Sequence, residues 1–220
     1  RGARLLPDVP NGVAREALEA RHARRRFAVA LGRICPEKGF HIALDAAKRA
    51  GVPLLLAGQT FPYEAHETYC AREIAPRLDA SRRCIGPIGP ARKRRLLSAA
   101  RCLLVPSLAP ETSSLVAMEA LACGTPVIAF ASGALPEIVE HGRTGFIVRD
   151  AEEMAEAIHE AARIAPAVCR AAARERFSLE RMLGRYFALY RRLAQRGRPE
   201  VAAAGRATSR SIGSHARPGD

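Results

Sequence analysis

The chain contains no tryptophan, and aromatic residues make up only 5% of its 220 residues. Lysine is also scarce: Arg supplies nearly all of the 35 basic residues, which outnumber 22 acidic ones and give a net charge of +13. Such a charge is typical of nucleic-acid-binding proteins, but the aromatic residues that stack on bases are not interleaved with the basic ones. We therefore expect a basic solvated surface and no nucleic-acid partner.

Long apolar runs are missing as well. No run approaches the roughly 18 residues that cross a bilayer, and residues 1–4 are not followed by the apolar stretch of a secretory signal. The six cysteines form no C-x-x-C pair, and several lie within apolar runs. We expect free thiols in a reducing, cytoplasmic location. Peripheral contact of the basic surface with acidic membrane lipids stays open.

Metal-ligand patterns are absent from the sequence. No D-x-D pair offers a clamp for a metal-bound diphosphate, and His41, His66, His141 and His159 show no ligand spacing with Cys or Asp. The sequence therefore predicts no metal site and no resident cofactor.

What the sequence does contain is a regular alternation of strands and helices. Apolar runs predict strands at residues 27–31, 54–57, 84–86, 103–105, 127–130 and 145–148. Helical spacing predicts helices at 40–50, 64–78, 91–99, 115–123 and 135–139. Since parallel neighbours need crossover connections, this order favours an α/β fold with a doubly wound parallel sheet of about six strands and helices on both faces.

After residue 150 the pattern becomes wholly helical, with helices expected at 151–163, 166–175 and 179–193. The last one carries an apolar stripe that should pack on another apolar surface. Its members are Met182, Leu183, Tyr186, Leu189, Tyr190 and Leu193. The predicted organisation is a linker at 1–26, a domain at 27–195 that includes the C-terminal helices, and a disordered basic tail at 196–220.

The most informative pair of residues is Glu111 and Glu119. A buried strand precedes Glu111, Ser113 or Ser114 can cap the following helix, and Glu119 lies within that helix. Eight helical residues span about 12 Å, too far for two carboxylates to share one proton or metal ion. They can instead hold two ends of an extended ligand, with phosphates at the helix start between them. A nucleotide sugar has this form.

A second charged pair follows the first predicted strand. Arg33 comes directly after residues 27–32, and Lys38 opens the next helix. Both side chains should therefore emerge at the carboxyl end of the strand, where parallel sheets bind ligands, with charges suited to a diphosphate. A surface pair without function is the alternative on these two residues alone.

Five ordered segments resemble the retaining glycosyltransferases of family 4. They are PNGV (10–13), GRICPEKG (32–39), E-x7-E (111–119), CGTPVI (123–128) and GALPEIVEHGRTGFIV (133–148). The similarity covers residues 9–195 and resembles the carboxyl-terminal, nucleotide-sugar-binding half of a GT-B enzyme. It implies a Rossmann-like domain and an N-terminal acceptor-binding domain that this chain lacks.

The resemblance also implies residue roles. Arg33 and Lys38 would grip the donor pyrophosphate, Glu111 would contact the transferred sugar near the reacting carbon, and Glu119 would hold the ribose. Backbone amides of Ser113, Ser114 and Leu115 would bind sugar or phosphate oxygens, and the turns at Gly58, Gln59 and Ile88 would contact the base. The family usually has Gly-aromatic-Gly after the first Glu, whereas this chain has Thr112, Ser113 and Ser114.

The implied activity is transfer of a sugar from a nucleotide-diphosphate sugar to an acceptor hydroxyl, with retention of configuration and without a metal. The catalytic residues would be Glu111, Arg33 and Lys38. Two alternatives remain: a noncatalytic nucleotide-sugar-binding module, and a GT-B-like epimerase or hydrolase.

Overall fold

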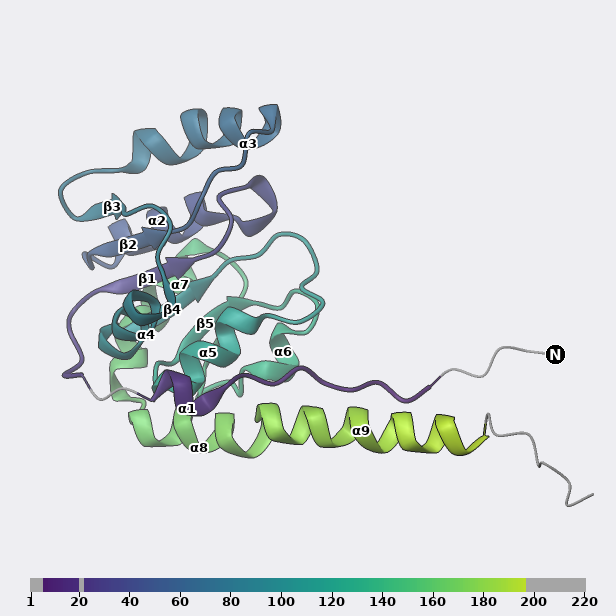
Figure 1. Cartoon of the computed structure of the whole chain (residues 1–220). Coiled ribbons are helices and arrows are strands. Elements are labelled where there is room, and N and C mark those ends of the chain that lie inside the picture. The colour runs from purple at the N-terminus through teal and green to yellow at the C-terminus, as the bar shows by residue number, and fades with distance from the viewer. Residues whose placement is uncertain (1–5, 20–21, 197–220) are drawn as a thin grey trace, which may run out of the picture.

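The computed structural model describes residues 6–19 and 22–196 (Figure 1). The predicted disordered tail, 196–220, lies outside the described residues apart from Arg196, and so do residues 1–5 and 20–21 of the predicted linker. In the described part no helix combines the length and the apolar character needed to cross a membrane. The proposed domain limits stay predictions.

The centre of the molecule is a six-stranded sheet in the order β3-β2-β1-β4-β5-β6, in which all neighbouring strands are parallel. Its strands are β1 Ala28–Leu31, β2 Leu54–Ala57, β3 Arg82–Cys84, β4 Cys102–Val105, β5 Val127–Phe130 and β6 Gly145–Val148. The order of the strands reverses between β1 and β4, and this switch point is where ligands bind in such sheets. The predicted doubly wound sheet is confirmed.

Helices cover both faces of the sheet (Figure 1). One core cluster joins alternate strand residues to α4 Pro90–Ala99, α5 Leu115–Cys123, α6 Leu135–Ile138 and α8 Pro166–Arg176. The other joins the opposite strand residues to α2 Phe40–Arg49 and α7 Ala151–Glu160. Strand residues belong to the two clusters in turn because successive side chains of a strand point to opposite faces of the sheet. Three short helical elements lie between these parts: α1 Arg15–Leu18, η1 Pro36–Lys38 and η4 Ala161–Arg163.

Two predicted elements differ in detail. The helix expected at 64–78 consists of α3 Glu64–Tyr69, a π turn at Cys70–Ile74 and a 3-10 turn at Ala75–Arg77. The strand expected at 84–86 lies at 82–84, because the Asp79 carboxylate accepts hydrogen bonds from the amides of Ser81 and Arg82 and turns the chain there. Gly86 has a φ of 69°, which no strand residue adopts.

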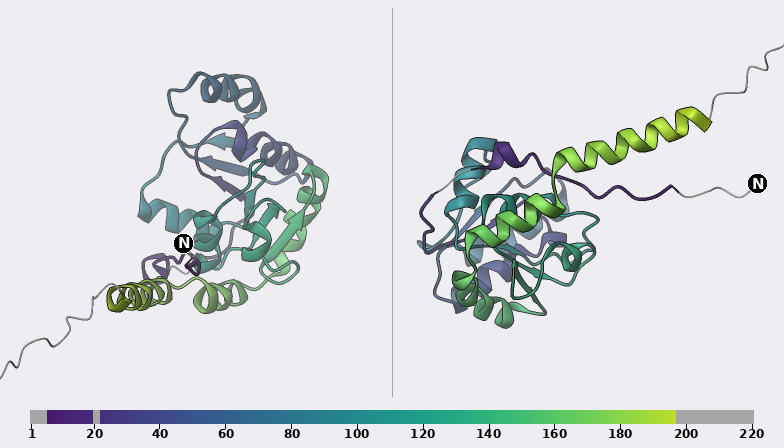
Figure 2. Two further views of the ribbon diagram at one scale, coloured as in Figure 1. Left: turned by 90° about the vertical axis from the view of Figure 1, so that its right-hand side faces the viewer. Right: turned by 90° about the horizontal axis from the view of Figure 1, so that it is seen from below.

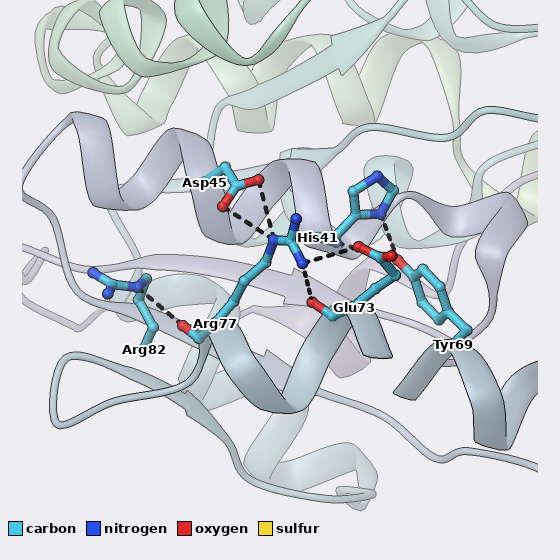
Figure 3. A network of polar contacts seen from close by, with 6 residues as sticks. All are labelled: His41, Asp45, Tyr69, Glu73, Arg77 and Arg82. Atoms are coloured by element: carbon cyan, nitrogen blue, oxygen red, sulfur yellow. Dashed lines mark hydrogen bonds and ion pairs between the residues drawn. The ribbon is translucent and has the colours of Figure 1, made fainter. Parts of the chain in front are cut away.

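A polar network fastens the segment 64–77 to α2 (Figure 3). The Arg77 guanidinium donates to both Asp45 carboxylate oxygens at 3.1 Å and to the Glu73 carboxylate at 2.9 Å. The Tyr69 hydroxyl accepts from the His41 amide at 3.2 Å, and burial raises its pKa to about 12. This network fixes the end of α3 and the two turns that follow it against α2.

The last helix, α9 Leu179–Arg196, extends beyond α8 and away from the sheet (Figure 2). Its base is tied to the N-terminal segment, since the Val13 amide donates to the Phe177 carbonyl at 2.9 Å and the Leu179 amide donates back to Val13 at 3.3 Å. The predicted packing of the stripe is wrong for half of its members: Leu183, Tyr190 and Leu193 are exposed, Tyr190 by 58%, whereas Met182, Tyr186 and Leu189 are half-buried. In the described part of the chain the three exposed side chains stay uncovered.

All six cysteines lie in the described part of the chain and none forms a disulfide. Cys35, Cys102, Cys123 and Cys169 are buried, as expected for small apolar side chains, whereas Cys84 is exposed.

Candidate functional site

The loops after β1 and β2 meet at the carboxyl edge of the sheet. A Cβ atom on Gly58 would lie 1.8 Å from the Gly32 carbonyl oxygen, so only glycine permits this approach. The Ile34 amide donates to the Gln59 carbonyl at 3.0 Å, and the Gly58 amide donates to Gly86 at 3.0 Å. The first three strands along the chain therefore end in one interlocked rim.

The loop carrying Arg33 and Lys38 packs against the loop that follows β4. Gly39, at the start of α2, has a φ of 62°, and a Cβ atom there would lie 2.2 Å from the Pro106 carbonyl oxygen. The Leu108 amide donates to the Glu37 carbonyl at 2.8 Å. These contacts bring Lys38 to the Glu111 loop although 73 residues separate the two side chains.

Glu111 is the centre of the site. One of its carboxylate oxygens accepts from Lys38 Nζ at 2.5 Å and from the Ser107 hydroxyl at 2.5 Å. The Glu111 carbonyl accepts from the Ala134 amide at 2.7 Å, which ties its loop to the one before α6. The Glu111 side chain is only 12% exposed, so its charge depends on these partners.

A cavity of about 310 Å³ opens beside this pair, and we call it the edge cavity. It is lined by Arg33, Glu37, Lys38, His66, Ala109, Pro110, Glu111 and Thr112. The three predicted catalytic residues therefore share one cavity at the carboxyl edge of the sheet. Glu37 and His66 were not identified from the sequence, because neither belongs to a local pattern that marks a ligand.

Glu119 lies outside the lining of the edge cavity. Its carboxylate accepts from Lys93 Nζ of α4 at 2.5 Å. Lys93 was missed by sequence reasoning, and its only signal was its place in a basic run after a turn. The helix begins only at Leu115, so the 12 Å estimate, which assumed about 1.5 Å per residue throughout, does not describe residues 111–114.

The other predicted ligand-binding residues surround this region. Ser114 occupies the N-cap position of α5 but makes no side-chain capping bond, and the Leu115 amide donates to the Ser113 carbonyl at 3.1 Å. Ser113 and Thr112 line a second cavity of about 490 Å³ on the side of α6 and α9, and Thr112 borders both cavities. Ile88 is half-buried in the loop before α4. Of these residues only Thr112 lines the edge cavity.

Three potential metal ligands also meet at the rim. One ligand atom each of Cys35, Glu37 and His66 lies within 4.8 Å of the other two. Burial raises the pKa of the Cys35 thiol, and the Glu37 backbone amide, by hydrogen bonding, lowers the pKa of the Glu37 carboxyl. His66 Nδ1 is buried and has no hydrogen-bond partner in the described structure. Sequence spacing gave no hint of this group, because Cys35 and Glu37 lie at η1 and His66 lies in α3, far along the chain.

The strand order and the charged cavity at the switch point define a Rossmann-like α/β domain. Residues 25–163 match the family model of the group 1 glycosyl transferases, and the chain belongs to this family.

Curated relatives are considerably longer than this chain. The D-inositol 3-phosphate glycosyltransferase of Mycobacterium tuberculosis is 36% identical over 179 residues, which are 76% of this chain and 37% of that protein. The protein of the same name from Mycobacteroides abscessus is 37% identical over 135 residues, which are 59% of this chain and 30% of that protein. The chain thus spans about a third of the length of these relatives.

Solved glycosyltransferase structures share the fold. AviGT4, involved in avilamycin A biosynthesis, is 28% identical with a TM-score of 0.73 over 89% of this chain and 60% of that one. HepE of Anabaena, in complex with UDP-glucose, is 26% identical with a TM-score of 0.65 over 78% of this chain and 49% of that one. The chain therefore has the Rossmann-like architecture of one half of a GT-B fold.

Proposed function

We propose that this chain is the donor-binding half of a retaining family 4 glycosyltransferase. The observation that carries the proposal is that Arg33, Lys38 and Glu111 line one cavity at the carboxyl edge of the sheet. A diphosphate in this cavity would gain charge-assisted hydrogen bonds from Arg33 and Lys38. HepE, which shares the fold, is described with UDP-glucose, and this supports a nucleotide-sugar donor.

Each end of the donor has candidate partners. Glu111 would accept hydrogen bonds from hydroxyls of the transferred sugar, while the amides of Ser113 and Ser114 would bind phosphate or sugar oxygens at the start of α5. The Leu115 amide would join them by exchanging its bond to the Ser113 carbonyl for one to the ligand. Glu119, held by Lys93, would bind the ribose hydroxyls. Gly58, Gln59 and Ile88, on the β2 and β3 sides, would contact the base. The ligand would therefore extend from Glu111 across the α5 start toward β3.

The proposed reaction needs no metal. Arg33, Lys38 and the α5 N-terminus would stabilise the negative charge that develops on the departing diphosphate. Retention would follow from attack of the acceptor hydroxyl on the same face as the leaving phosphate, whose oxygen would take the hydroxyl proton. Glu111 would position the sugar in this step.

Calorimetry with UDP, GDP and ADP tests the donor site. We expect at least one of them to bind, and the substitution Glu119→Ala to weaken that binding about tenfold through lost ribose hydrogen bonds. Glu156→Ala, on the exposed side of α7, is the matched control and should leave the affinity unchanged. The proposal fails if none of the three binds the folded chain at millimolar concentration.

We further infer that the exposed stripe of α9 packs against an acceptor-binding domain outside this chain. The exposed members of the stripe are Leu183, Tyr190 and Leu193, and the exposed Phe187 of the same helix adds to this apolar surface. The match covers 60% of AviGT4, so two fifths of that protein lie outside the region that resembles this chain. A domain in that remaining part is the kind of partner that could cover the stripe. Residues 6–12 leave the domain on the same side as α9 (Figure 2), which places both segments toward the same region.

The paired substitution Phe187→Glu and Tyr190→Glu tests this interface. In this chain we expect the wild type to bind an apolar dye and to self-associate, and the variant to lose both properties while keeping its unfolding free energy within about 0.5 kcal/mol. Ala188→Glu, on the opposite side of α9, should change neither. Sedimentation of the wild type with anionic but not neutral lipid vesicles, lost in the variant, would assign the stripe to a membrane instead.

A further inference from the structure

The side chains of Cys35 and Glu37, at η1, meet that of His66, in α3, at the wall of the edge cavity. Cys35 and Glu37 stand on either side of Pro36, where η1 begins, and His66 lies in the first turn of α3. Their ligand atoms lie within 4.8 Å of one another. Glu37 and His66 also line the edge cavity, so anything bound to all three would border that cavity.

The donor set suits one kind of ligand. Sulfur, imidazole nitrogen and carboxylate oxygen together are typical of Zn²⁺, which binds such atoms at about 2.0–2.3 Å. Neighbouring ligands of a tetrahedral zinc ion are therefore roughly 3.5 Å apart, so ligand atoms within 4.8 Å of one another would need to approach by about 1 Å at most to bind one ion. Nδ1 of His66, one of the two imidazole nitrogens that can bind zinc, is buried and has no hydrogen-bond partner in the described structure.

The rest of the structure holds these side chains close together. The helix α3, which contains His66, is fastened to α2 at its last residue, where the Tyr69 hydroxyl accepts a hydrogen bond from the His41 amide (Figure 3). The Glu37 carbonyl accepts from the Leu108 amide, which fixes η1 from the other side. A site built between two anchored loops loses little conformational entropy when it takes up an ion.

We propose that Cys35, Glu37 and His66 form a Zn²⁺ site on the wall of the edge cavity, with a fourth position left to water or a ligand. On binding, the Cys35 thiol loses its proton to solvent and the sulfur forms a bond with the ion. The ion holds no reacting atom of the proposed transfer. Its effect is on the charge of the cavity.

The change in charge is simple to count. The ion brings two positive charges to the site, and the Cys35 thiol gives up one proton. With zinc, two anionic ligands balance the ion, so the wall beside Arg33 and Lys38 becomes more positive by one charge. Zinc and a diphosphate should therefore strengthen each other's binding, a consequence that rests on the proposed function.

Metal binding is measured first and without any nucleotide. We expect about one Zn²⁺ per chain in equilibrium dialysis, and Co²⁺ in its place should show the thiolate-to-cobalt absorption band. Cys35→Ser should abolish the band, and His66→Gln should weaken zinc binding at least about tenfold, as expected for the loss of a ligand. Cys84→Ser and His159→Gln, at exposed positions, are the matched controls and should behave as wild type.

Two results would overturn the site: a Co²⁺ spectrum without a thiolate band, or unchanged zinc affinity in both Cys35→Ser and His66→Gln. His66 is only half-buried, so its variant tests the site even if Cys35→Ser folds poorly. UDP is then titrated at buffered free zinc, where we expect about a fivefold gain in affinity in wild type and none in His66→Gln. Zinc binding with no such gain would refute the coupling, while zinc binding in a chain that binds no nucleotide would refute only the donor site.

Discussion

Replacing Gly133 with alanine should destabilise the chain by about 2–5 kcal/mol and displace the Glu111 loop. Gly133 has a φ of 57°, and a Cβ atom there would lie 2.2 Å from the Glu111 carbonyl oxygen and 2.5 Å from its amide nitrogen. Both atoms belong to backbone and cannot rotate away. The bond from the Ala134 amide to Glu111 would be lost with the displacement. Urea unfolding measures the first effect, and calorimetry with a sugar nucleotide measures the second.

Gly142→Ala is the matched control for this prediction. Gly142 has a φ of 77°, but nothing lies within 4 Å of a Cβ atom built on it. Its substitution should therefore cost only the backbone strain, about 1–2 kcal/mol, and leave ligand binding intact. Equal losses of stability for the two variants would mean that the close approach at Glu111 does not exist in solution.

Lys38→Ala should weaken UDP binding about 100-fold, the largest effect expected at the site. The substitution removes a cation from the edge cavity, and it also exposes the diphosphate to a Glu111 carboxylate that Lys38 no longer neutralises. Glu111→Gln should act in the opposite direction, because it removes a negative charge and releases Lys38. We expect a few-fold gain in affinity for free UDP and a loss for the intact sugar nucleotide.

Calorimetry with both ligands separates these effects. Lys48→Ala, an exposed lysine further along α2, is the control for a general change of charge and should leave both affinities unchanged. If Glu111→Gln weakened free UDP as strongly as Lys38→Ala does, Glu111 would have to bind the diphosphate directly, and the proposed roles of the two residues would be wrong.

The order of elements was predictable because each strand is a short apolar run and each helix has its own periodicity. Residues 54–57, 127–130 and 145–148 match the observed strands. The shift of β3 was not predictable by this route, since its residues are half-buried or exposed and the Asp79 turn sets where it begins. The two edge strands differ in this respect: β6 has the apolar sequence GFIV and was predicted at its observed position, whereas β3 has the polar sequence RRC.

The site was predictable only where the ligand-binding pattern is local. Arg33 and Lys38 follow a strand directly, and Glu111 follows another, so the rule for parallel sheets places them at one edge. Lys93 contacts Glu119, and His66 lies close to Glu37, although each pair is far apart in the sequence. No spacing in the sequence indicates either pair. The stripe of α9 was predictable but its exposure was not, because periodicity shows that a helix face is apolar and does not show what covers it.

The Lys38–Glu111 contact has a consequence for product release. A diphosphate that takes Lys38 leaves the Glu111 carboxylate, 12% exposed, with the Ser107 hydroxyl as its remaining side-chain partner. In the proposed function, a sugar hydroxyl of the intact donor replaces Lys38 as hydrogen-bond donor to Glu111. The nucleoside diphosphate left after transfer has lost that sugar and cannot donate this bond. The cavity would then hold its substrate more firmly than its product, and Lys38 returning to Glu111 would help the spent nucleotide leave.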